Sequence, residues 1–472
     1  MHLIDTIYID GAFVRPHGDE IIDMIDPATE AVIGTVRLAD AVDAGLAVAA
    51  ATRALPAMAR TSVAERIAML GRLHDAVLAR NDELHAATIT EYGGPSARAA
   101  WVAQFAAQTF LDAARALEET PLTRSMGSAT VVLEPVGVAA LVTPWNSSAG
   151  SMCSKLAMAL AAGCSVVIKP SEASPLQTRI VSEAFHAAAL PPGVVNIVTG
   201  RGQVVVTALT AHPDVAAISF TGSTAVGKLV MQQGAASMKR LGLALSGKSA
   251  TVLLDDADLG QAIPLAVNAA FQNNGQACVA GTRLLVPRHL LDEVTAGVRA
   301  VVAAMKVGDP RDPATHIGPL ASAAKFERIQ KYIALGLAEG AQLVAGGPGR
   351  PEGRQQGWFV RPTVFAGVDN SMVIAREEIF GPVLCIIAYD DEAQAIAIAN
   401  DSDYGLQAYV LSSDLARARR VADALKAGRV LINTLQHEPL APFGGYKQSG
   451  LGREFGVFGL EAFLEVKSVI AA

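Results

Sequence analysis

The stretch that decides the fold is VAALVTPWNSSAGSMCSKLAMALAAGCSVVIKPSE, residues 138–172. It opens with the apolar run 138–142 and nearly closes with a second run at 165–168, and both have the length of strands. The Ala- and Leu-rich segment around 151–162 between them predicts a helix. Strands that are apolar throughout are covered on both faces, so the stretch predicts a βαβ unit of a parallel sheet.

Segments on the C-terminal side extend this α/β pattern. Ser174 and Pro175 suit the N-cap and first turn of the next helix, and the runs 194–198 and 215–220 predict further strands. A second α/β run follows residue 254, with a strand predicted at 282–286.

Three other segments do not alternate between strand and helix. Residues 39–117 are rich in Ala, Leu, Arg and Glu with helical spacing of apolar residues, and 124–133 is prone to form strands. The last segment, 461–472, alternates as an edge strand does.

The composition excludes several classes of protein. The chain has 472 residues, 51% apolar and 18% charged, which is typical of two or three well-packed domains. A net charge of −7 offers no basic surface for nucleic acid, and the absence of an 18-residue apolar run argues against a membrane span. Four cysteines without a CxxC pair argue against disulfides and structural zinc, so we expect a protein of the reducing cytoplasm without a metal.

One cysteine lies in a segment suited to chemistry, NGQAC at residues 274–278. A thiolate that attacks a carbonyl needs a lowered pKa and hydrogen-bond donors for the oxyanion that forms, and a nearby glycine lets backbone N–H groups approach. We interpret Cys153, Cys164 and Cys385 as small buried hydrophobes. From this segment alone, the same interpretation stays open for Cys278.

Two polar motifs follow predicted strand ends, where ligands collect in an open α/β sheet. In TPWN, residues 143–146, the amide of Asn146 can donate to an oxyanion without ionising, although asparagine is also common in plain turns. In KPSE, residues 169–172, Lys169 and Glu172 could hold the hydroxyls of a ribose, or form an exposed ion pair of little consequence.

The loop FTGSTAVGK, residues 220–228, lies between a predicted strand and a helix, where free N–H groups and the helix dipole favour phosphate. It nearly matches the GxxxxGK[ST] loop of nucleoside triphosphatases, but Leu229 stands where a hydroxyl should hold Mg²⁺. A dinucleotide pyrophosphate needs no such hydroxyl, so the loop favours a dinucleotide.

With EEIFGPV (377–383) and PFGGYKQSG (442–450), these segments resemble the aldehyde dehydrogenase superfamily, from about residue 5 to the C-terminus. The resemblance implies an α/β fold with two parallel-sheet domains, one Rossmann-like for the cofactor and one catalytic, and a small β flap that makes homodimers or homotetramers. The implied boundaries are 1–120 and 136–246 for the NAD-binding domain, 247–450 for the catalytic domain, and 121–135 and 455–472 for the oligomerisation segments.

The resemblance also implies roles for individual residues. Cys278 matches the nucleophile and Asn146 the oxyanion donor, aided by the Cys278 N–H. The implied cofactor contacts are Thr143, Trp145, Lys169, Ser171, Glu172, Gly202, Phe220, Gly222, Ser223, Val226, Leu245, Glu378 and Phe380. Glu172 accepts from a 2′-hydroxyl and repels a 2′-phosphate, which favours NAD, with NADP as the alternative. In this family the thiolate adds to an aldehyde, hydride leaves for the nicotinamide, and water cleaves the thioester.

One position departs from the family pattern. The family's Glu-Leu-Gly-Gly-Lys reads ALSGK at residues 244–248, so the general base expected at Ala244 is a methyl group, and Ser246 has no evident role. Slow thioester hydrolysis is expected, because a lost general base costs roughly 10²–10⁴-fold in its step. Three explanations stay open: an engineered substitution, a substitute proton relay through Lys155 and Glu454, or acyl transfer to a thiol such as coenzyme A.

The sequence indicates less about the substrate than about the reaction. Small side chains follow the Trp-Asn pair and leave volume for a bulky or extended aldehyde, although helix packing would also select them. No charged clamp is evident, and His437 and Glu438 either line the pocket mouth or lie in an exposed loop. The alternative from another class is a cofactor-binding protein without catalytic activity, against which intact Cys278, Asn146 and Lys169 argue.

Overall fold

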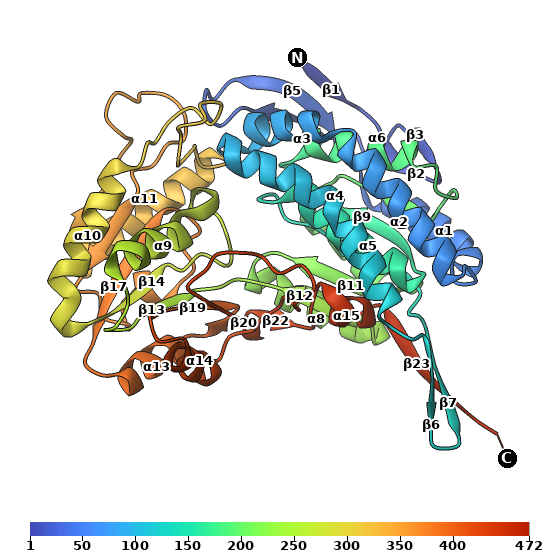
Figure 1. Cartoon of the computed structure of the whole chain (residues 1–472). Helices are drawn as coiled ribbons and strands as arrows, with labels where there is room; N and C mark the ends of the chain where they lie inside the picture. The colour runs from blue at the N-terminus through green and yellow to red at the C-terminus, as the bar shows by residue number, and fades with distance from the viewer. Residues whose placement is uncertain (472) are drawn as a thin grey trace.

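Two large, mostly parallel sheets form the body of the protein (Figure 1). The structure is a computed structural model and describes residues 1–471. The eight-stranded sheet has the order β22-β12-β11-β8-β9-β10-β2-β3, with β12 through β10 in that order parallel. Its strands are β2 (Ile7–Ile9), β3 (Ala12–Val14), β8 (Val138–Val142), β9 (Ser165–Lys169), β10 (Val195–Ile197), β11 (Val215–Thr221), β12 (Arg240–Ala244) and β22 (Gly450–Leu451). The strands predicted at 138–142, 165–168, 194–198 and 215–220 are confirmed as β8 to β11.

Helices cover both faces of this sheet, as the apolar strands predict. Ala139 and Leu141 of β8 face the core shared with α2, α4, α5 and α6. Ala140 and Val142 of the same strand face the core shared with α1, α7 and α8. The helices of this half are α1 (Ala41–Met58), α2 (Val63–Leu78), α3 (Asn81–Ala87), α4 (Ser96–Glu118), α5 (Ser148–Ala162), α6 (Pro175–Ala187), α7 (Thr207–Ala211) and α8 (Thr224–Gly234). Because successive side chains of a strand point to opposite faces, both sides of β8 are buried.

The seven-stranded sheet has the order β15-β16-β17-β14-β13-β19-β20 and is parallel except at β15. Its strands are β13 (Ala250–Leu253), β14 (Arg283–Pro287), β15 (Gln342–Ala345), β16 (Thr363–Ala366), β17 (Val383–Tyr389), β19 (Gln407–Leu411) and β20 (Arg429–Ile432). Its helices are α9 (Leu259–Phe271), α10 (Leu291–Ala304), α11 (Ala323–Ala338), α12 (Val373–Arg376), α13 (Glu392–Asn400) and α14 (Leu415–Ala424). Helices α9 and α10 cover one face, and α11, α13 and α14 cover the other. The predicted strand at 282–286 is confirmed as β14.

Three small sheets complete the fold. Strands β6 (Thr123–Met126), β7 (Ala129–Pro135) and β23 (Leu464–Ile470) make an antiparallel sheet that projects from the body, at the lower right of Figure 1. The segment 124–133 and the edge strand near the C-terminus, both predicted, are thus found paired with each other. The remaining small elements are β1 (His2–Ile4), β4 (Ile21–Ile25), β5 (Val32–Arg37), β18 (Tyr404–Gly405), β21 (Tyr446–Lys447) and α15 (Gly456–Glu461).

Helix α6 begins as the sequence predicts, with Pro175 in its first turn, but its cap is different. The hydroxyl of Ser174 donates to the carbonyl of Trp145 at 3.3 Å and makes no capping bond. The buried carboxylate of Glu91 instead accepts from the N–H groups of Leu176 and Gln177, at 2.7 and 3.0 Å. A remote carboxylate thus satisfies the helix terminus, and Ser174 is freed to fix the loop that precedes Asn146.

Helix α1 is the one described helix that is long and apolar enough, by length and composition, to cross a membrane. Its apolar side packs on the eight-stranded sheet, where Ala44, Ala47 and Val48 are fully or almost fully buried. Asp40 caps its first turn by accepting from the N–H groups of Val42 and Asp43, and Arg53 pairs with Asp10 near its last turns. These contacts are those of a core helix.

Candidate active site

Loops from both halves of the protein meet in one cleft. The residues that line it include many of those predicted for the site: Trp145, Asn146, Gly222, Ser223, Ala244, Leu245, Cys278, Glu378 and Phe380. The other predicted cofactor residues lie outside this lining: Thr143, Lys169, Ser171, Glu172 and Phe220 at or just after strand ends of the eight-stranded sheet, Gly202 at the start of a short helical turn, and Val226 in the first turn of α8.

The Cys278 loop follows α9 through a tight turn. Asn273 and Asn274 adopt left-handed backbone conformations, with φ of 55° and 60°. Gly275 follows with φ of 70°, and a Cβ there would lie 2.3 Å from the carbonyl carbon of Gly381. Only glycine allows this approach, which brings the 377–383 loop against the cysteine loop.

Cys278 is partly exposed in the cleft, whereas the other three cysteines are buried. Burial raises the pKa of the Cys278 thiol to about 12, and the negative charge of Glu378 adds to the effect. The pKa is thus raised, and not lowered as the argument from the attacking thiolate required. The sequence could not reveal this, because Glu378 lies 100 residues away along the chain.

The side chain of Asn146 is held beside the cysteine loop. Its Nδ2 donates to the carbonyl of Gln276 at 2.8 Å, two residues before Cys278. Asn273 ties the same elements together, because its Nδ2 donates to the carbonyls of Asn146 and Gln276 at 3.2 and 3.1 Å. An amide nitrogen carries two N–H groups, so Asn146 keeps one for an oxyanion.

On the side of the predicted cofactor contacts, the lysine and the glutamate of the KPSE segment form an ion pair. Lys169 ends β9, and its Nζ donates to Glu172 at 2.8 Å. Burial alone would raise the pKa of the Glu172 carboxyl, but Lys169 and the N–H of Gly202 hold it below its usual value. At neutral pH, Glu172 is therefore an ionised acceptor at the rim of the sheet.

The glycine-rich loop joins β11 to α8. Ser223 caps the helix by accepting from the N–H of Val226 at 3.4 Å. Gly222 and Gly227 permit close packing: a Cβ would lie 2.5 Å from the Phe220 ring at Gly222 and 2.6 Å from Leu245 at Gly227. Gly222 and the N-cap residue Ser223 line the cleft, so the N-terminus of α8, where the helix dipole favours negative charge, lies at its edge.

Ser246, for which the sequence offers no role, links two parts of the cleft. Its Oγ accepts from the N–H of Thr224 at 3.4 Å, and its hydroxyl lies near the Glu378 carboxyl. Burial raises the pKa of Glu378, while Ser246 and the N–H of Gly247, 3.0 Å away, act against the increase. The serine thus lies beside both the first turn of α8 and Glu378.

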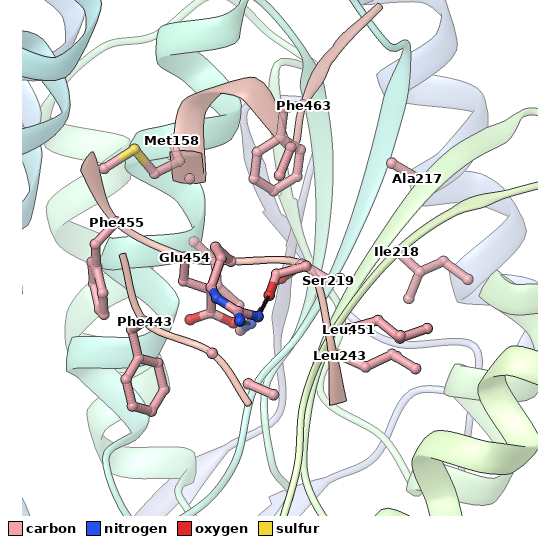
Figure 2. A pocket seen from close by; sticks show the side chains of 18 of the residues that line it. Met158, Ala217, Ile218, Ser219, Leu243, Phe443, Leu451, Glu454, Phe455 and Phe463 are labelled. Carbon is pink, nitrogen blue, oxygen red and sulfur yellow. Dashed lines mark hydrogen bonds and ion pairs between the residues drawn. The ribbon is translucent and has the colours of Figure 1, made fainter. Parts of the chain in front are cut away.

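A second cavity lies behind Ala244, which lines both cavities. Lys155 points into it, and its Nζ donates to Glu454 at 2.5 Å and to Ser219 at 2.7 Å. Figure 2 shows Glu454 and Ser219 at its centre, with the rings of Phe443, Phe455 and Phe463 around them. The predicted pair of Lys155 and Glu454 is therefore formed, within a largely apolar enclosure.

Sequence reasoning missed several residues of the site. Lys325 of α11 lies 4.1 Å from the ring centroid of Trp145, and Arg328 lines the same cleft. Arg98 and Arg429 line a third, wider cleft, whose wall includes Ala277 and Val279, the neighbours of Cys278. None of these cations lies in a recognisable motif, and only the tertiary packing brings them to the cysteine loop.

The sequence matches the family model described as the aldehyde dehydrogenase family over residues 13–469. It is 46% identical over 465 residues to the 3-succinoylsemialdehyde-pyridine dehydrogenase of a Pseudomonas species, covering 98% of each chain. It is 43% identical to a putative aldehyde dehydrogenase of Staphylococcus aureus, again over 98% of each chain.

Solved structures agree with these matches. A cysteine-to-alanine variant of aldehyde dehydrogenase C from Pseudomonas syringae, crystallised with NAD⁺ and octanal, superposes with a TM-score of 0.97 at 46% identity. The match covers 99% of this chain and 96% of that one. The Mycobacterium tuberculosis aldehyde dehydrogenase in complex with NAD⁺ gives 0.96 at 41% identity, covering 100% and 98%.

Proposed function

Because the chain belongs to the aldehyde dehydrogenase family, we propose that it oxidises an aldehyde to a carboxylate with NAD⁺, through a covalent bond to Cys278. The observation that carries the proposal is that Cys278 lines one cleft while its neighbours Ala277 and Val279 line another. One is lined by Gly222 and Ser223 at the dipole end of α8, and the other, beside Ala277 and Val279, is open to a substrate. A thiol that borders a proposed nucleotide site, next to a proposed substrate channel, suits hydride transfer from a covalent adduct.

The chain's own residues supply the nucleophile and the stabilisation of charge. After the Cys278 thiol has lost its proton to water, its sulfur attacks the carbonyl carbon, and the free N–H of Asn146 with the N–H of Cys278 stabilises the oxyanion. NAD⁺, when bound, supplies the hydride acceptor. Glu172 accepts from a ribose hydroxyl and repels a 2′-phosphate, which supports NAD over NADP, and the relatives crystallised with NAD⁺ agree with this preference.

Hydrolysis of the thioester is proposed to be slow, because Ala244 cannot accept a proton from water. The pair of Lys155 and Glu454 lies in the cavity behind Ala244 and is the acid–base pair that could serve in its place. Its ammonium and carboxylate are engaged with each other at 2.5 Å, so the relay is proposed as a partial substitute.

The wide third cleft supports an extended or bulky aldehyde. It is walled by Trp101 and Phe105 of α4, whose rings stack at 4.8 Å between centroids. The Pseudomonas syringae relative binds octanal, an extended aldehyde, in its crystal. We propose the same kind of elongated substrate here.

The projecting sheet is proposed to join subunits into a homodimer or homotetramer, with 121–135 and 455–472 as the oligomerisation segments. Its exposed side chains include Met126, Val466 and Ile470, an apolar surface that a partner would cover. Sedimentation should give a monomer for a Val466→Lys, Ile470→Lys variant, and an unchanged mass would contradict the role of this sheet in joining subunits.

Residues 1–120 and 136–246 are proposed as the NAD-binding domain and 247–450 as the catalytic domain. The reducing cytoplasm is proposed as the location.

Rapid mixing with NAD⁺ and octanal tests the function. A fast burst of NADH, one equivalent per Cys278, followed by slow turnover, is expected from an intact nucleophile without its general base. Cys278→Ala should give no burst. Absence of NADH from the unmodified enzyme would contradict the proposed function, and rapid turnover without a burst would contradict slow hydrolysis. Strong acceleration by coenzyme A would favour acyl transfer over hydrolysis.

A further inference from the structure

The wide cleft beside the Cys278 loop contains a charged side chain with unused hydrogen-bonding capacity. Arg98, in the first turn of α4, lines the cleft, and its guanidinium carbon lies 4.3 Å from the centroid of the Trp101 ring. Its Nε is buried and has no hydrogen-bond partner within residues 1–471. The two Nη atoms are not buried and make no hydrogen bond within the described chain, so they are available to donate to a ligand in the cleft.

A second arginine approaches from the other sheet. Arg429, the first residue of β20, donates from Nε to Gln407 at 2.9 Å and bonds Nδ1 of His437 at 3.1 Å. Burial and the neighbouring Arg429 lower the pKa of His437 to about 4, so this ring is neutral at pH 7. Since Arg429 can only donate, Nδ1 of His437 accepts and Nε2 carries the hydrogen. That Nε2 is also buried and without a partner within the described chain.

Acidic side chains do not neutralise these arginines. Within residues 1–471, neither Arg98 nor Arg429 has a carboxylate oxygen within salt-bridge distance. Asp112 is the acidic residue in the cleft wall, and it lies fourteen positions beyond Arg98 on α4, roughly 21 Å along the helix axis. Arg98 and Arg429 therefore line the cleft as cations without an acidic partner, and the acid of the cleft wall is remote from Arg98.

We propose that this cleft selects an aldehyde whose far end carries a carboxylate, held by Arg98 and Arg429. A planar guanidinium places two N–H donors where they can bond both oxygens of a carboxylate. Trp101 and Phe105 would contact the carbon chain. The inference rests on the proposed function. In the reaction, hydride passes to NAD⁺, water supplies the oxygen, and the aldehyde end becomes a second carboxylate, so the product is a dicarboxylate.

The test compares 8-oxooctanoate with octanal, two aldehydes of equal chain length that differ in the terminal carboxylate. The second-order rate constant of the NADH burst should be at least roughly tenfold higher for 8-oxooctanoate. Arg98→Met and Arg429→Met should each reduce this ratio several-fold. Arg115→Met is the matched control, because Arg115 lies on the same helix, is paired with Glu119 and is not among the cleft residues. Its ratio should equal that of the unmodified enzyme.

Equal rates for the two aldehydes in the unmodified enzyme would overturn the carboxylate inference and leave the proposed function standing. A ratio that persists in both arginine variants would also overturn it. Absence of NADH with either aldehyde would overturn both proposals. If the variants do not fold, inhibition of the unmodified enzyme decides: octanedioate should bind at least roughly tenfold more tightly than octanoate, and equal inhibition would overturn the inference.

Discussion

The side-chain amide of Asn146 donates to the backbone carbonyl of Gln276 at 2.8 Å. Asn146 follows β8 of one sheet, whereas Gln276 lies in the turn after α9 of the other. This bond fixes the distance between the oxyanion donor and Cys278 across the two halves of the protein. It uses one of the two N–H groups of the amide and leaves the other free.

Asn146→Ala should slow the NADH burst by roughly 10²–10³-fold, as the loss of one oxyanion donor does. Stopped-flow absorbance of NADH measures the rate. Asn273→Ala is the control for position alone, because Asn273 contacts the same two loops and is not proposed to reach the oxyanion. A burst rate for Asn146→Ala equal to that of Asn273→Ala would contradict the role of Asn146.

Ala244→Glu should restore a general base and raise steady-state turnover by roughly 10²–10⁴-fold, up to the rate of the next slowest step. The longer side chain would extend from the end of β12 into the cavities that Ala244 lines. Ala244→Gln has the same shape without the base and should stay slow. Equal turnover by the two variants would show that the proton acceptor lies elsewhere, and Lys155 with Glu454 would then be the first pair to test.

Alkylation of Cys278 should increase about tenfold for each pH unit from 7 to 10, because the pKa of its thiol is raised to about 12 and the thiolate fraction grows throughout this range. An ordinary thiol levels off near pH 9. Glu378→Gln removes a negative charge that raises this pKa, so it should lower the pKa and speed alkylation at pH 8. Iodoacetamide labelling followed by peptide mass spectrometry gives both profiles, and a plateau below pH 9 in the unmodified enzyme would refute the raised pKa.

Glu172→Gln should shift cofactor preference toward NADP, because it removes the carboxylate that would repel a 2′-phosphate. The ratio of kcat/KM for NAD⁺ to that for NADP⁺ should fall by roughly tenfold or more. Glu20→Gln is a useful control, since Glu20 pairs with Arg201 on the surface near the same rim. An unchanged ratio in Glu172→Gln would remove Glu172 from the determinants of cofactor choice.

The parallel strands could be predicted from the sequence because both of their faces are buried. Along β8 and β9, every residue is buried, and so the apolar runs have sharp ends. Strand β12 was not predicted, because its sequence RLGLA begins with a half-buried arginine and contains a glycine. Its strand conformation comes from pairing with β11 on one side and β22 on the other.

The site was predictable where a motif carries its own geometry and unpredictable where packing supplies it. Gly222 and Ser223 at a strand-to-helix turn are of the first kind. Packing supplies the raised pKa of Cys278, the position of Ser246 beside Glu378 and the two arginines of the wide cleft. Arg98 and Arg429 lie 331 positions apart, and nothing in either segment indicates that they line one cleft.

Intact-protein mass spectrometry of the quenched reaction tests the covalent role of Cys278 most directly. With NAD⁺ and octanal, the protein should gain the mass of the aldehyde less two hydrogen atoms, on the peptide that contains Cys278, as NADH appears in equal amount. That gain corresponds to an acyl group that replaces the thiol hydrogen of Cys278, in a thioester that is hydrolysed slowly. NADH formed without an adduct on Cys278, or formed at an unchanged rate by Cys278→Ala, would contradict the account.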